Sequence, residues 1–445
     1  MKTPPALTRT LLSLAISALG MPMAAHAALS FSTAPAGSAT KEPAPNVIVS
    51  VDNSGSMGDT GITALKDALK ATFDPGFIED GRIRLAYQAM WGCDKNSTTP
   101  SFDPSKDKSC GAFVPMASLT GSSTAEDGSH RRKFFKWIDT LKHGSNTPTH
   151  MMMYNAGEYL KVTGDNSPWN AIPGTADSKP IACRRAYHIL MTDGGWNYYN
   201  DMPMFNGEFK TTTAEIYDQH LDNADGTQKT LPDGKIYNPA SAESRVYTDP
   251  WGRQAVDGRF AWVGRNRTIY DSKGRCEDRT SQCQKQSFFA WVDVVPTISD
   301  MAFHYWSTDL QPSLKSSDPL KNVQPIIRKS GDENFSANGK SQILSEYWNP
   351  KNNPATWRHM TTFTIGFKGA ATWPTITTDP VFGTNTFDGD FEKLVVGDKT
   401  WGNPVQPNLD TPEDWYLNKT YTNKYASTAS AEDARQQELW HIALN

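Results

Sequence analysis

The chain has 445 residues, a hydrophobic fraction of 38% and a formal net charge of −4 at pH 7. This length predicts either two domains or one domain with large insertions, and the apolar content is sufficient for a buried core. Lysine and arginine together number 44 against 48 aspartates and glutamates, so the charge balance excludes the basic footprint of a nucleic-acid-binding protein. It also gives no reason to expect attraction to a membrane surface.

The N-terminus has the features of a signal peptide. A positively charged start precedes an apolar segment at 11–19, which is too short to form a stable membrane span, and the small residues Ala25 and Ala27 fit a cleavage site. We therefore expect residues 1–27 to be removed on export and residues 28–44 to form a linker. No later stretch approaches transmembrane length, so no transmembrane segment is expected in the mature chain.

The five cysteines would then lie in an oxidising compartment. Cys93 and Cys110 flank one polar loop, and Cys276 and Cys283 flank another, so both pairs are possible local disulfides. The sequence does not fix their connectivity. Cys183 is left over just before an apolar stretch and is expected to be a buried thiol. No close CxxC or HxxxH pair supports a zinc site.

An apolar, β-branched run at 47–51 predicts a strand that is buried on both faces, and apolar residues at helical spacing follow at 62–72. Between these segments, Asp52, Ser54 and Ser56 alternate with other residues in a tight polar loop. A carboxylate and two hydroxyls are hard oxygen ligands that suit Mg²⁺ or a similar divalent cation. The alternative interpretation is a capping aspartate with two turn serines. A loop between a strand and a helix is where open α/β sheets bind ligands.

Strand and helix patterns alternate along the rest of the chain. Further strands are expected at 82–91, 113–116 (an edge strand), 185–191, 323–327 and 360–367, and helices at 131–141, 151–160, 296–305 and 429–444. This alternation predicts an α/β fold with a doubly wound, mostly parallel, Rossmann-like sheet. Residues 197–285 and 368–428 lack periodicity and are expected to be long, loop-rich insertions. Within the first insertion, 222–226 and 232–234 are expected to be solvated turns rather than calcium loops.

The order Asp52, Ser54, Ser56 resembles the metal-ion-dependent adhesion site of von Willebrand factor type A domains. In that family a threonine from a second loop and an aspartate from a third complete the site, and the matching positions here are Thr147 and Asp193. The resemblance implies one such domain over 45–445, interrupted by the two insertions. It also implies a bound divalent cation, with Mg²⁺ preferred and Ca²⁺ or Mn²⁺ as alternatives.

Several blocks are similar to the N-terminal half of PilY/PilC-type tip proteins of type IV pili. These blocks are 49–57, 146–149, 183–197, 302–312, 357–367 and 439–445. The resemblance implies an exported protein of the periplasm, the outer-membrane surface or the pilus tip that supports pilus biogenesis, adhesion and surface sensing. Members of that family carry a C-terminal β-propeller, which would begin where this sequence ends, so a fragment or a shortened member is expected.

The main functional hypothesis is a metal-dependent adhesive module whose cation receives an acidic group from a host or surface ligand or from minor pilus subunits. In a second hypothesis the metal only rigidifies the loops of a structural pilus-tip module. A third hypothesis combines Ser54 or Ser56 with His150 and Asp193 as a serine hydrolase triad. There is no GxSxG motif, and the serines suit a cation, so no enzyme is expected. His150 is otherwise a helix residue with local hydrogen bonds.

Overall fold

The computed structural model describes residues 42–90, 113–144, 147, 149–193, 224–249, 297–366, 378–379, 383–384, 389–401 and 429–444. Apart from Glu42, these residues belong to one compact unit, Pro43–Asn445. The predicted signal peptide, most of the predicted linker and the cysteines at 93, 110, 276 and 283 lie outside the described residues. The predicted domain boundaries and disulfides therefore stay predictions.

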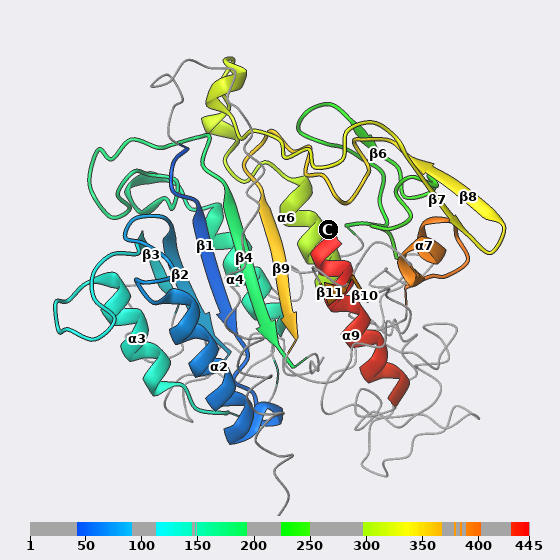
Figure 1. Cartoon of the computed structure of the whole chain (residues 1–445). Helices are drawn as coiled ribbons and strands as arrows, with labels where there is room; N and C mark the ends of the chain where they lie inside the picture. Colours follow the sequence, from blue (N-terminus) through cyan, green and yellow to red (C-terminus); the bar gives the residue numbers. More distant parts are fainter. Residues whose placement is uncertain are drawn as a thin grey trace, which may run out of the picture. The chain divides into compact units, whose positions relative to one another are not determined.

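A five-stranded sheet lies at the centre of the described chain (Figure 1). Its spatial order is β3-β2-β1-β4-β9, and only β3 runs antiparallel to its neighbour. The strands are β1 (Asn46–Val51), β2 (Arg84–Ala89), β3 (Val114–Ser118), β4 (Ala186–Thr192) and β9 (Met360–Gly366). Along the chain, β2 and β3 are added on one side of β1, and β4 and β9 are then added on the other side. The predicted doubly wound α/β fold is confirmed, and the sheet's topological switch point lies between β1 and β4.

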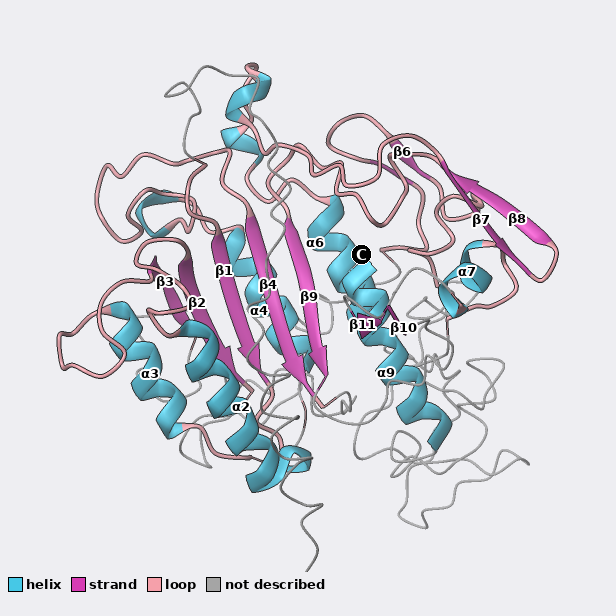
Figure 2. Ribbon diagram, in the orientation of Figure 1, coloured by secondary structure: helices cyan, strands magenta, loops and turns pink. Residues whose placement is uncertain are grey.

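Helices cover both faces of this sheet (Figure 2). The α-helices are α2 (Gly58–Phe73), α3 (His130–Thr140), α4 (Thr149–Leu160), α6 (Ile298–Ser307), α7 (Asp390–Val395) and α9 (Ala429–Leu444). Single 3₁₀ turns occupy Gly55–Met57, Gly164–Asn166, Pro312–Leu314 and Pro319–Lys321. Three two-stranded hairpins complete the described elements: β5 (Lys229–Thr230) with β6 (Ile236–Tyr237), β7 (Glu333–Ala337) with β8 (Lys340–Leu344), and β10 (Thr378–Asp379) with β11 (Gly383–Thr384).

Successive residues of β1 enter different cores, which explains why the strand reads as a continuous apolar run. Val47, Val49 and Val51 pack in the core that α2 and α3 cover. Ile48 packs in the core that α4, α6 and the end of α9 cover. Met152 and Met153 of α4 belong to this second core, and Met151 is also buried, so the predicted packing role of the methionines is confirmed. The α4–α6 contact is close, because a Cβ on Gly157 would lie 2.2 Å from the ring of Tyr305.

A third core lies outside the sheet and draws on both predicted insertions. It joins aromatic and aliphatic residues of 231–247 and 391–401 to Phe303 of α6 and to Trp357. The described parts of the insertions are therefore packed against the rest of the unit. The turn predicted at 232–234 is present, with Gly234 at φ +91°.

One secondary-structure prediction between α6 and β9 was wrong, and one element there was not predicted. The segment 323–327 forms no strand, and within it only Ile326 makes an isolated bridge, to Asn353. A hairpin, β7–β8, occupies 333–344 instead. Its turn holds Asn338 and Gly339 at φ +52° and +77°. An Asn-Gly pair between two alternating runs is a strong hairpin signal, so this element could have been predicted.

A row of buried polar groups crosses the sheet beneath α4. Gln88 Nε2 donates to Ser50 Oγ at 2.7 Å and to the carbonyl of Met152 at 2.7 Å. The Ser50 hydroxyl lies 2.8 Å from Nε2 of His188, whose side chain is fully buried. Burial lowers the pKa of His188 from 6.5 to about 3. The imidazole is therefore neutral in the folded protein at physiological pH.

This burial makes stability depend on pH. In the unfolded chain His188 takes up a proton as the pH falls below 6.5, whereas in the folded chain it does not until about pH 3. Stability should therefore fall on acidification, by about 2 kcal/mol between pH 7.5 and pH 5 from this group alone. Urea unfolding at both pH values should show this loss in the unmodified chain and a smaller loss in His188→Gln. Equal losses in the two proteins would contradict the assignment.

Candidate metal site at the sheet edge

The ends of β1 and β4 bring two predicted site residues together. The two strands are parallel neighbours, with Val51 opposite Met191. Asp52 and Asp193 follow them directly at the carboxyl edge of the sheet. The Asp193 amide lies 3.4 Å from Oδ2 of Asp52 and donates to it, and both side chains are buried. The two aspartates, 141 positions apart in sequence, are therefore adjacent at the switch point.

The Asp52 carboxylate is held in a fixed orientation by its neighbours. Its Oδ1 accepts a hydrogen bond from the Ser54 amide at 2.7 Å, and its Oδ2 accepts one from the Thr192 hydroxyl at 2.7 Å. Thr192 was not singled out from the sequence, although it directly precedes Asp193. Its position could have indicated this role, because its hydroxyl lies beside a predicted ligand at the end of a buried strand.

The two serines lead from this buried carboxylate toward solvent. Ser54 is fully buried, whereas Ser56 is exposed within the 3₁₀ turn that precedes α2. Their hydroxyl oxygens lie 2.9 Å apart. Asp52, Ser54 and Ser56 thus form a continuous series of oxygen atoms from the sheet edge to the surface.

The second predicted loop is attached to the first through Asn53. The Asn53 carbonyl accepts a hydrogen bond from the Gly144 amide at 2.5 Å, and its side-chain amide donates to the Lys142 carbonyl at 2.9 Å. Thr147 follows three residues after Gly144, and 6% of its surface is exposed. The loop that carries Thr147 therefore starts against the loop that carries Asp52.

Two adjacent carboxylates out of water are electrostatically unfavourable. Burial and the negative charge of Asp193 raise the pKa of Asp52 to about 6, although hydrogen bonds from Ser54 and Thr192 oppose this shift. A divalent cation at this edge would remove the repulsion. The donors are carboxylates and hydroxyls, a set that fits Mg²⁺, Ca²⁺ or Mn²⁺.

His150 and Cys183 were also singled out from the sequence. His150 is buried in the first turn of α4, the position expected of a helix residue rather than of a ligand. Cys183 is a free thiol, and it is half-buried rather than buried as the sequence predicted. No helix among the described residues is long and apolar enough to cross a membrane.

Comparison with known proteins gives one consistent similarity. No family model matches the chain. Over 318 residues, 72% of this chain, it is 33% identical to the type IV pilus biogenesis factor PilY1 of Pseudomonas aeruginosa strain PAK. Over the same length it is 31% identical to PilY1 of the P. aeruginosa strain PAO1. The chain spans only 18% of the length of these curated relatives.

Solved structures are more distant. Manganese-loaded TRAP protein of Plasmodium vivax has 14% identity and a TM-score of 0.21, with 40% of this chain and 54% of that chain covered. This likeness is too weak to carry an argument about the site. Over most of its length, the chain is homologous to one part of the type IV pilus biogenesis factor PilY1.

Proposed function

We propose that the chain is a von Willebrand factor A-like module that binds a divalent cation at its sheet edge and serves adhesion and assembly in a type IV pilus system. The observation that carries this proposal is the adjacency of the buried carboxylates of Asp52 and Asp193 at the switch point of the sheet. Two carboxylates placed together in a buried site need a positive partner, and an oxygen donor set selects a hard cation.

In this proposal Asp52, Ser54, Ser56 and Thr147 contact the ion directly or through water, and Asp193 lies close by. When bound, the cation supplies an electrophilic position that accepts an acidic oxygen from a partner. Ser56 is exposed while Asp52 is buried, so the solvent side of the site lies at Ser56. A partner carboxylate would approach from that side. The hydrogen bonds from Ser54 and Thr192 keep the Asp52 carboxylate in position before the ion arrives.

The similarity to PilY1 supports the biological setting. It leads us to propose an exported protein of the periplasm, outer-membrane surface or pilus tip, with minor pilus subunits or an acidic surface ligand as partners. Surface sensing belongs to the same proposal. The relatives are described as biogenesis factors, which favours an assembly and adhesion role over the serine hydrolase alternative.

A structural role is the second candidate, and one contact favours it. The Asn53 hydrogen bonds already join two loops of the site, so an ion could simply complete a rigid connection among three loops. In this case the ion would support assembly without contacting a partner.

Cells that carry Asp52→Asn in their own gene separate the two roles. We expect them to assemble surface pili in normal number but to lose adhesion to an abiotic surface in Mg²⁺-containing medium. The matched control is Asp67→Asn, which changes an exposed aspartate on α2. Loss of pili together with adhesion would favour the structural role. Normal pili and normal adhesion would remove the adhesive proposal.

A further inference from the structure

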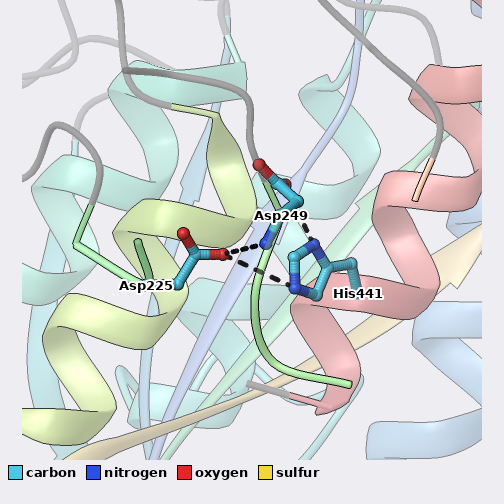
Figure 3. A group of neighbouring side chains, drawn as sticks. All are labelled: Asp225, Asp249 and His441. Atoms are coloured by element: carbon cyan, nitrogen blue, oxygen red, sulfur yellow. Dashed lines mark hydrogen bonds and ion pairs between the residues drawn. The ribbon is translucent and has the colours of Figure 1, made fainter. Parts of the chain in front are cut away.

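Three buried side chains from distant parts of the chain meet in a cluster that includes none of the sheet-edge residues (Figure 3). Asp225 and Asp249 lie at the two ends of the described segment 224–249, and His441 lies in the last turn of α9. Their exposed fractions are 0%, 3% and 1%. One oxygen or nitrogen atom from each lies within 4.8 Å of the others. The prediction of a solvated turn at 222–226 was therefore wrong at Asp225.

The contacts inside this cluster leave two polar atoms unsatisfied. Oδ2 of Asp225 accepts a hydrogen bond from the Asp249 amide at 3.2 Å and lies 3.6 Å from Nε2 of His441. Nδ1 of His441 lies 3.2 Å from Oδ2 of Asp249. Oδ1 of Asp225 and Nε2 of His441 have no hydrogen-bond partner although both are buried. These two atoms belong to residues of the kinds that bind metals.

Further acidic groups surround the cluster, but the start of α6 stabilises them. Glu438 Oε1 accepts hydrogen bonds from the amides of Ile298 at 2.5 Å and Ser299 at 3.3 Å. Asp300 forms a capping box with Thr297. The helix N-terminus thus supplies donors and partial positive charge to these two carboxylates.

Asp225 receives fewer donors in the described contacts, because its Oδ2 accepts a hydrogen bond from the Asp249 amide and its Oδ1 has no hydrogen-bond partner. Among the described residues, no lysine or arginine forms an ion pair with Asp225 or Asp300. The imidazole of His441 lies beside both Asp225 and Asp249. A cation would give the buried Oδ1 of Asp225 and Nε2 of His441 the partner that they lack.

We propose that Asp225, Asp249 and His441 bind a divalent transition-metal ion such as Zn²⁺ or Mn²⁺ at a second site, independent of the sheet-edge site. An imidazole nitrogen beside carboxylate oxygens favours these ions over Mg²⁺ or Ca²⁺. Two ligands each about 2.1 Å from a tetrahedral ion lie about 3.4 Å apart, close to the separation of Asp225 Oδ2 and His441 Nε2.

The surroundings of His441 fit this assignment. Nδ1 of His441 faces Asp249 and Nε2 faces Asp225, so the imidazole lies between the two carboxylates. The imidazole also stacks on Trp401, with ring centroids 4.4 Å apart and an interplanar angle of 14°. Trp401 is itself held by a hydrogen bond from Nε1 to the Val246 carbonyl at 3.1 Å. The ion would tie α9 to the loop segment that builds the third core.

Thermal melting of the full chain carrying Asp52→Asn tests the second site with the sheet-edge site disabled. After treatment with EDTA and removal of the chelator, Zn²⁺, Mn²⁺, Mg²⁺ and Ca²⁺ are added separately. We expect Zn²⁺ or Mn²⁺ at a hundredfold excess over its Kd to raise Tm by about 3–5 °C, because the ion binds only the folded state. Elemental analysis of this protein should find about one such ion per chain.

A second substitution, added to Asp52→Asn, shows which residues bind the ion. Asp225→Asn removes a buried charge with little change of shape, so this protein should fold, and it should lose the rise in Tm. His441→Gln should lose it as well. Asp165→Asn, which changes an exposed aspartate, should keep it. The proposal is overturned if neither Zn²⁺ nor Mn²⁺ raises Tm, or if the rise persists in both Asp225→Asn and His441→Gln.

Discussion

Asp52→Asn is expected to abolish stabilisation of the chain by Mg²⁺ and, in the absence of the ion, to raise its free energy of unfolding at pH 7. The carboxylate has a pKa of about 6 in the folded protein against 3.8 unfolded, so its ionisation costs about 3 kcal/mol at neutral pH. Asparagine removes that cost but weakens one hydrogen bond, worth about 1 kcal/mol. The net gain without ion is about 2 kcal/mol.

The pH dependence of the free energy of unfolding provides a separate test of the sign of this effect. The cost of ionising Asp52 is absent below pH 3.8, grows as the pH rises to 6 and is constant above that value. Urea unfolding in EDTA should therefore show Asp52→Asn as the more stable protein at pH 7 and nearly equal stabilities at pH 4. Adding Mg²⁺ at pH 7 should stabilise only the unmodified chain and the Asp67→Asn control. Retained stabilisation of Asp52→Asn by Mg²⁺ would rule out Asp52 as a ligand.

Arg358→Met is expected to lower the free energy of unfolding by about 3–5 kcal/mol. The guanidinium is 1% exposed and pairs with both carboxylate oxygens of Asp309, with Nε 3.0 Å from Oδ1. It also donates to Asn322 Oδ1 at 2.9 Å. The Arg358 carbonyl accepts from the Leu310 amide at 2.7 Å, so this residue joins the segment after α6 to the start of β9. Methionine would fill the space but leave the Asp309 charge nearly buried without its partner.

A double substitution distinguishes loss of the pair from loss of packing. Arg358→Met with Asp309→Asn should recover much of the stability, because no uncompensated charge remains. The surface control Arg82→Met, which breaks an exposed pair with Glu79, should cost under about 1 kcal/mol. Urea midpoints measure all three proteins. A loss in Arg358→Met no greater than in the surface control would show that the buried pair does not anchor β9.

Local sequence patterns predicted much of the sheet and its helices. The β-branched run of β1 is buried on both faces, as predicted, because a central parallel strand has helices on each side. Thr297 and Asp300 form the capping box that starts α6, and α9 has the predicted bounds. These features depend on residues that are neighbours in sequence. The alternation of such segments was sufficient to predict the fold class.

The failures involve residues whose surroundings come from distant segments. Asp225 lies in a turn-like sequence and was predicted to be solvated, but α6, α9 and the third core bury it. Thr192 was not predicted to hold Asp52, since that contact depends on the pairing of β1 with β4. His441 was considered only as part of a helix. Its proximity to two aspartates about 200 positions earlier has no local sequence signal.

The sequence by itself determined the strand–loop–helix around Asp52, the order of the elements and the oxygen-rich residue types of the sheet-edge site, because these depend on local periodicity and side-chain chemistry. The tertiary structure decided that Asp52 and Asp193 are adjacent, that their carboxylates are buried, and that Asp225, Asp249 and His441 converge. The physical reason is that strand order and the folding back of α9 set these distances and exclude water from the groups, and neither effect is encoded by residues adjacent in the chain.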